Sequence, residues 1–207
     1  MFLLLLVSSV LLPRTSIEPV TDPAEIDRLI RQLGSDNFAK RQEASKALET
    51  VGEPALEALR KAAKGGDAEV RRRANELVRT IEDRRATQRH AIALAIVRRR
   101  GGRCEIDKDS PGKPVVRVIL FKSRVTDDEV RQLKWLSRLR YLDLAGTGVT
   151  DACLDSLREL RELQFLDVSG TKVTRAGLID LQKFLPKLKI KRRYIDNNYD
   201  NVDVPRK

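Results

Sequence analysis

A period of 24 residues runs through the second half of the sequence and constrains the fold more than any other feature. Apolar side chains recur at this spacing in aligned columns, of which the clearest are Val118, Leu142, Leu166 and Ile190; Leu120, Leu144 and Val168; and Val125, Val149 and Val173. Such columns indicate repeated units that stack on one another, because one unit alone cannot bury its apolar face.

Each row of the repeat predicts a short strand, a turn and a helix. Leu142 and Leu144 lie two residues apart and therefore share one face of a strand. Thr150 stands where a helix would need an N-cap, as do Thr126 and Thr174. The predicted helices carry the further columns Val130, Leu154 and Leu178; Leu133, Leu157 and Leu181; and Leu136, Leu160 and Phe184. We therefore expect an α/β solenoid, with parallel strands on one side and helices on the convex side.

The rows over residues 114–190 resemble leucine-rich repeats, whose pattern is L-x-x-L-x-L-x-x-N-x-L. Ser123, Thr147 and Thr171 stand at the position of the usual Asn, so we expect a ladder of hydroxyls there. The string SGTKVTRAGL at 169–178 resembles the GT-x-VTDAGL repeats of bacterial leucine-rich repeat proteins. It is also similar to repeats of F-box substrate receptors, although no F-box segment is evident. The resemblance implies a fold and says little about a ligand.

Residues 22–83 predict a small all-α segment with a second, shorter-range repeat. A shift of 30 residues places Ile26 on Leu56, Leu29 on Leu59 and Ala44 on Ala74. The D-x-E-V-R-x-R-A stretch at 67–74 resembles HEAT-type helical repeats. About two such units imply a HEAT-like stub that precedes the solenoid.

The two ends of the chain lack periodicity. Residues 1–21 contain the run FLLLLVSSVLL, which has the length of a signal-peptide core and is too short to span a bilayer. A basic leading segment and an A-x-A cleavage site are missing, so a mis-assigned start or a buried helix is the alternative. If this run is a signal peptide, we predict export to the periplasm or beyond the cell. If it is not, we predict a cytoplasmic protein. Residues 191–207 predict a polar C-terminal tail.

A basic connector over residues 84–113 separates the two repeat regions. It holds nine basic and three acidic side chains, a net charge of +6 out of +11 for the whole chain. We expect it to cap the solenoid, with a helix at 90–100 that ends at Gly101-Gly102 and a strand at 103–107. Its four clustered arginines, Arg98, Arg99, Arg100 and Arg103, are candidate anion-binding residues.

No arrangement of residues in the sequence predicts catalysis. The single histidine, His90, has no partner at a recognisable spacing, and Cys104 and Cys153 stand far apart. The segment YLDLAGTGVTD imitates a dinucleotide-binding turn, but Asp151 would place a negative charge where the pyrophosphate lies. We predict no catalytic, cofactor-binding or metal-binding residues and expect a chain that is not an enzyme.

The expected contact surface lies on the strands. Tyr141 and Asp143 on one strand align with Phe165 and Asp167 on the next, on the face opposite the leucines. The leading hypothesis is a protein-interaction scaffold that binds an unidentified protein or peptide, including a basic one, through this concave face. The alternative is that nearby lysines neutralise both aspartates. A second function class is binding of nucleic acid or another anionic polymer through the connector. Oligomeric state and partner identity stay open.

Overall fold

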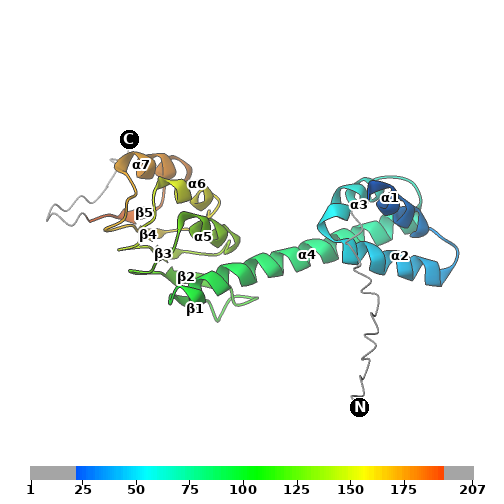
Figure 1. The fold of residues 1–207 in the computed structure, drawn as a ribbon, viewed down its shortest axis with the longest axis horizontal. Helices are drawn as coiled ribbons and strands as arrows, with labels where there is room; N and C mark the ends of the chain where they lie inside the picture. Colours follow the sequence, from blue (N-terminus) through cyan, green and yellow to red (C-terminus); the bar gives the residue numbers. More distant parts are fainter. Residues whose placement is uncertain (1–21, 194–207) are drawn as a thin grey trace, which may run out of the picture. The chain divides into compact units, whose positions relative to one another are not determined.

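The structure, a computed structural model, describes residues 22–193 and divides the chain into two compact units, residues 1–84 and 85–207. The predicted leader at 1–21 and residues 194–207 of the predicted tail lie outside the described residues. Figure 1 shows the chain coloured along its sequence. Each unit is described by itself below.

The first unit is built from helices. It contains α1 (Pro23–Gln32), α2 (Phe38–Val51), a short 3-10 turn (Glu53–Ala55), α3 (Leu56–Ala62) and the beginning of α4 (Ala68–Arg99). Polar caps begin three of them: the side chains of Asp22, Asn37 and Asp67 accept hydrogen bonds from backbone N–H groups of the following turn. Its buried core includes Leu33, Ala44, Leu48, Leu59 and Ala74.

Helix α4 is one continuous helix, whereas the sequence predicts a helical segment over residues 22–83 and a separate helix at 90–100. The intervening residues 84–89 read RRATQR and contain neither glycine nor proline, so nothing there ends the helix. It ends where predicted, because Gly101 adopts φ 70° and the Gly102 N–H donates to the Val97 carbonyl at 2.8 Å.

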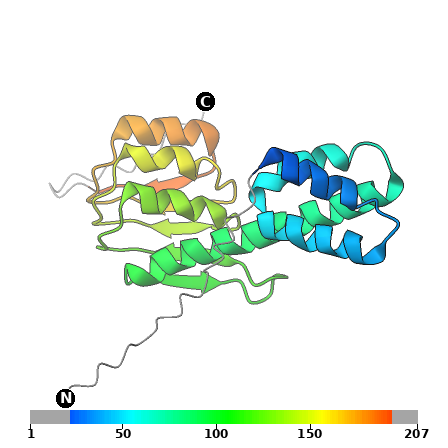
Figure 2. The same ribbon diagram turned by 45° about the vertical axis from the view of Figure 1, so that its right-hand side comes forward.

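The second unit contains one five-stranded mixed sheet in the order β1 (Arg103–Ile106), β2 (Val115–Ile119), β3 (Tyr141–Asp143), β4 (Phe165–Asp167) and β5 (Lys189–Lys191). Strand β1 runs antiparallel to β2, and the later neighbours are parallel. The helices α5 (Asp127–Gln132), α6 (Leu154–Leu157) and α7 (Arg175–Phe184) lie together on one face of the sheet (Figure 2).

The 24-residue spacing appears in the sheet as its register. Val118 pairs with Leu142, Leu142 with Leu166, and Leu166 with Ile190. The first three of these side chains are fully buried and Ile190 is 8% exposed. Because parallel strands need a crossover between them, each period holds one strand and one return path through a helix.

The predicted solenoid is wrong: the second unit is an α/β domain around one mixed sheet. A solenoid is a row of similar layers in which each touches its neighbours alone. Here the antiparallel β1 lies beside β2, and Ala93 and Val97 of α4 join the same buried core as the leucines of every row. The helices also differ, with 6, 4 and 10 residues in α5, α6 and α7. A fixed spacing specifies strand register and leaves open what packs around the sheet.

One column of the repeat fails in its last member. Leu136 and Leu160 are buried, but Phe184 is 56% exposed, and Leu185 occupies the buried position instead. Helix α7 continues through Phe184 as regular α-helix, whereas α5 and α6 give way to tighter turns well before the equivalent residue. The continuation shifts the buried position by one residue and turns the phenylalanine outward.

The hydroxyl column also differs from the expected ladder. The Thr147 hydroxyl donates to the Leu144 carbonyl at 2.6 Å, and the Thr171 hydroxyl donates to the Val168 carbonyl at 2.7 Å. Ser123 Oγ is buried without a hydrogen-bond partner among the described residues. These hydroxyls therefore close turns within their own rows and do not link one row to the next, because they are shorter than an asparagine side chain.

Aspartate–threonine contacts link the rows instead. Asp127 accepts hydrogen bonds from the backbone N–H and the hydroxyl of Thr150, both at 2.8 Å. Asp151 accepts the same pair from Thr174, at 2.7 and 2.6 Å. Gly177 permits this approach, since a Cβ there would lie 2.6 Å from Asp151 Oδ1. We call these two contacts the Asp–Thr clasps.

Replacing Asp127 tests the contribution of a clasp. Asp127→Ala removes two charge-assisted hydrogen bonds, so we expect the free energy of unfolding to fall by about 2 kcal/mol. The neighbouring Asp128, whose side chain is 84% exposed and pairs with Arg131, is the matched control, and Asp128→Ala should cost less than about 1 kcal/mol. Urea unfolding followed by the fluorescence of Trp135, the single tryptophan, reads out this unit. Equal losses in the two variants would contradict the role of the clasp.

Candidate binding face of the sheet

The candidate site is the face of the sheet that α5, α6 and α7 leave uncovered (Figure 2). Side chains alternate along a strand, so Tyr141 and Asp143 point to the face opposite the buried Leu142. Phe165 and Asp167 flank the buried Leu166 in the same way. The pairs Tyr141–Phe165 and Asp143–Asp167 are direct partners in the parallel register.

The aromatic row forms an ordered stack across the strands. The rings of Tyr141 and Phe165 lie 4.7 Å apart between centroids, at an interplanar angle of 7°. The Arg117 guanidinium lies 4.2 Å from the Tyr141 ring centroid, and it also pairs with Glu105 of β1 at 3.5 Å. Register places the exposed Lys189 beside Phe165 at the other end of the row. We call Arg117, Tyr141, Phe165 and Lys189 the aromatic row; its rigid rings are already fixed in place before a partner arrives.

The two aspartates beside this row are engaged within the protein. Asp143 Oδ1 accepts from the Ala145 N–H at 2.9 Å, and Asp167 Oδ1 accepts from the Ser169 N–H at 3.0 Å. Asp167 Oδ2 also accepts from the Lys191 ammonium at 2.7 Å, and the residue is 3% exposed. Burial opposes ionisation of Asp167, but the hydrogen bonds from Lys191 and Ser169 outweigh it and hold the pKa of the carboxyl below its usual value. Asp167 is therefore an internal ion pair and offers little surface to a partner.

The four connector arginines do not act as one group. Arg99 and Arg100 both bind the carboxylate of Glu129, at 2.6 and 2.8 Å, while Arg98 and Arg103 are exposed. Glu129 also accepts from the Thr126 N–H at 3.0 Å as part of the capping box that begins α5. The hydrogen bond from Arg100, supported by those from Thr126 and Arg99, lowers the pKa of Glu129 from 4.5 to about 2. Sequence spacing gave no sign of this cluster, because its members lie 29 and 30 residues apart.

Chemistry-bearing residues are dispersed in residues 22–193. No group of three or more His, Cys, Asp and Glu side chains in this part of the chain is placed to hold a metal ion. Cys104 is exposed and Cys153 buried, both as free thiols, and burial together with Asp127 raises the pKa of Cys153 to about 12. Among the helices of this same region, none has the length and apolar character needed to cross a membrane.

Comparison with known proteins identifies no family. No family model and no curated protein matches the chain. Among solved structures, a partial likeness links it to a chain of the Mex67:Mtr2 subunits from Chaetomium, with 23% identity, a TM-score of 0.37, and coverage of 51% of this chain and 68% of that one. A likeness at this level supports no statement about family or function.

The Glu129 cluster predicts a dependence of stability on pH. Its folded pKa of about 2 lies below the ordinary 4.5, so its contribution to stability is complete above pH 4.5 and is lost as the pH falls toward 2. The difference in unfolding free energy between the wild type and Glu129→Gln should therefore be largest at neutral pH and shrink in acid. Urea unfolding at a series of pH values, read by Trp135 fluorescence, measures it. A difference that stays constant through this range would rule out the carboxylate charge as its source.

Proposed function

We propose that the chain is a non-enzymatic protein-binding module whose contact surface is the aromatic row. The observation that carries the proposal is the stack of Tyr141 on Phe165, flanked by Arg117 on the outer side of Tyr141. Aromatic and arginine side chains are the residue types that supply most of the binding energy in protein interfaces. Because the strands hold these rings in register, a partner would not have to meet the entropy cost of ordering them.

The charges around the row favour an acidic partner. Asp167 is neutralised by Lys191, and Asp143, which accepts a hydrogen bond from the Ala145 N–H of the following turn, is the one carboxylate left beside the two cations of the row. Lys189 is exposed at one end of the row, and Arg117 is 41% exposed at the other. A segment with an apolar or aromatic residue between carboxylates would match this order of groups, which reverses the preference for a basic partner that the sequence suggested.

Two sequence features are part of the proposal. The GT-x-VTDAGL-type strings resemble those of bacterial leucine-rich repeat proteins. We propose that this resemblance extends to the sequence motif and not to the solenoid architecture. If residues 1–21 act as a signal peptide, as their sequence predicts, the module is exported to the periplasm or beyond the cell; otherwise it works in the cytoplasm.

The competing function, binding of nucleic acid or another anionic polymer through Arg98, Arg99, Arg100 and Arg103, has weaker support. Arg99 and Arg100 already share the Glu129 carboxylate, so a phosphate would have to replace or share those ion pairs. Binding driven by phosphate contacts falls steeply with salt. Retention on a DNA or RNA column at low salt, lost at high salt, would favour this function over the proposed one.

The test is capture of a partner by the chain from residue 22 onward, repeated with variants. Tyr141→Ala and Phe165→Ala remove the stack and leave the buried Leu142 and Leu166 in place, so both variants should fold. Phe38→Ala is the matched control, because Phe38 is a 62% exposed aromatic of the first unit. We expect a protein that the wild type and the control retain and both row variants lose.

The captured protein is then measured as a purified pair. Loss of either ring should raise the dissociation constant about 30-fold or more, as expected when a central aromatic residue is removed from an interface. Unchanged affinity in both row variants would exclude the aromatic row as the contact surface. Circular dichroism of each variant confirms that the comparison is made between folded proteins.

A further inference from the structure

A hollow opens beside the last row of the sheet. It has a volume of about 330 Å³ and lies between two consecutive helix-to-strand turns, residues 158–163 and 184–188. Its lining residues are Arg158, Arg161, Leu163, Phe184, Leu185, Pro186, Lys187 and Leu188. This volume is at the small end of the range for ligand sites, which runs from about 300 to 1,000 Å³.

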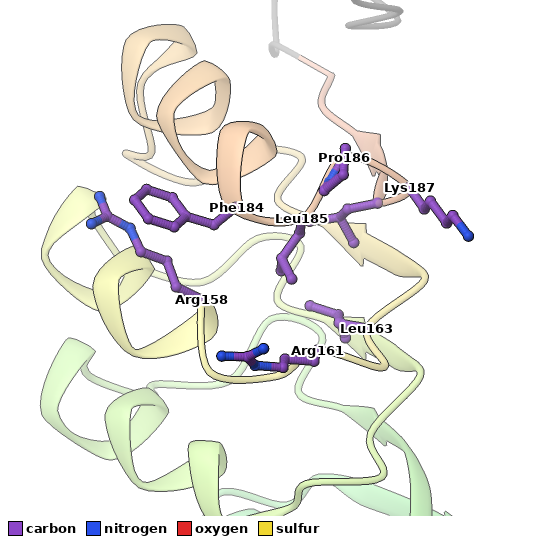
Figure 3. Close-up of a pocket in the computed structure, with 8 residues that line it drawn as sticks. Arg158, Arg161, Leu163, Phe184, Leu185, Pro186 and Lys187 are labelled. Carbon is purple, nitrogen blue, oxygen red and sulfur yellow. The ribbon is translucent and has the colours of Figure 1, made fainter.

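The one-residue shift in the last row creates this hollow. Leu185 takes the buried position that Leu160 holds one row earlier, so Phe184 turns outward and forms part of the wall. Figure 3 shows Phe184 next to Arg158 on one side and Leu185 with Leu163 on the other. The wall is therefore apolar on one side, and the guanidinium of Arg161 lies along its lower edge in this view.

The charges of the hollow leave one cation without a counter-charge at its edge. Arg158 pairs with Asp155 at 2.9 Å and lies 3.8 Å from Asp180, and its guanidinium stacks on Phe184 at 4.3 Å. Arg161 pairs with no carboxylate among residues 22–193. The Lys187 ammonium points away from the hollow in Figure 3. The Arg158 Nε is in addition buried without an acceptor in the described part of the chain.

We propose that this hollow binds a small aromatic monocarboxylate. The carboxylate is held by the guanidinium of Arg161, whose paired N–H donors match the two carboxylate oxygens. The ring packs against Leu163, Leu185 and Phe184. A single negative charge fits, because Asp155 and Asp180 offset Arg158 and the Lys187 ammonium points away, which leaves Arg161 as the uncompensated cation of the hollow. A dianion such as phosphate would find no partner for its second charge.

Titration of the full chain with benzoate tests the proposal, with benzamide and inorganic phosphate as comparison probes. Benzamide keeps the ring and loses the charge, and phosphate keeps charge and loses the ring. We expect saturable binding of benzoate, with a shift of the Arg161 Nε–H signal in the NMR spectrum, and at least tenfold weaker binding of benzamide and of phosphate. Equal binding of benzoate and benzamide, or of benzoate and phosphate, would overturn the assignment of a carboxylate with an apolar ring.

Variants locate the binding. Arg161→Gln should weaken benzoate binding about tenfold or more, and Arg161→Lys, which keeps the charge and loses the paired donors, should lie between it and the wild type. Phe184→Ala should also weaken binding and leave the fold intact, since that ring is 56% exposed. Lys172→Gln, at an exposed lysine outside the lining of the hollow, is the control for loss of a positive charge and should bind as the wild type does. Absence of saturable binding to the wild type, or equal binding to Arg161→Gln and Lys172→Gln, would refute the site.

Discussion

Burial of one apolar side chain per strand between the sheet and its helices is the interaction on which the second unit depends. Val118, Leu142 and Leu166 are fully buried and belong to one apolar cluster. Truncation of such a residue typically costs about 2–5 kcal/mol, a large part of the stability of a domain. Everything on the opposite face follows from it, because a strand that points Leu142 inward must point Tyr141 and Asp143 outward.

The sequence predicted the parts of this fold that local spacing specifies. The 24-residue columns predict which residues pair across strands, and the threonines at 126, 150 and 174 predict where each helical segment begins. The architecture was wrong, because periodicity does not reveal that antiparallel β1 and the end of α4 close around the same core. The break predicted in α4 was wrong because a change in charge along a helix was interpreted as a boundary, although nothing in 84–89 interrupts helical hydrogen bonding.

On the candidate face, too, the sequence predicts some side-chain contacts and misses others. Strand alternation predicts that Tyr141 meets Phe165, but it does not predict the Lys191 ammonium that neutralises Asp167 or the guanidinium of Arg117 over Tyr141. Those contacts depend on rotamers of long side chains, which sequence spacing does not specify. The outward turn of Phe184 has an equally local cause: α7 is longer than α5 and α6, and the resulting one-residue shift of the buried position is invisible in a column of apolar letters.

Acidic side chains in this unit serve mainly to join one segment to the next. Asp127 and Asp151 fasten successive rows through the Asp–Thr clasps, and Glu129 joins the start of α5 to Arg99 and Arg100 of α4. In the third row Arg175 follows Thr174 where the earlier rows have aspartate. The change coincides with the last described row, in which no further threonine needs such a partner.

Native-state amide hydrogen exchange tests most directly whether the sheet and its helices form one cooperative core. The amides of Leu120, Leu144 and Val168 each donate to the next strand, at 2.8, 2.8 and 2.9 Å. A single core predicts that these three amides exchange slowly and with the same free energy of opening, through one shared unfolding event. Opening energies that decline step by step from Leu120 to Val168, as independent layers would give, would contradict it.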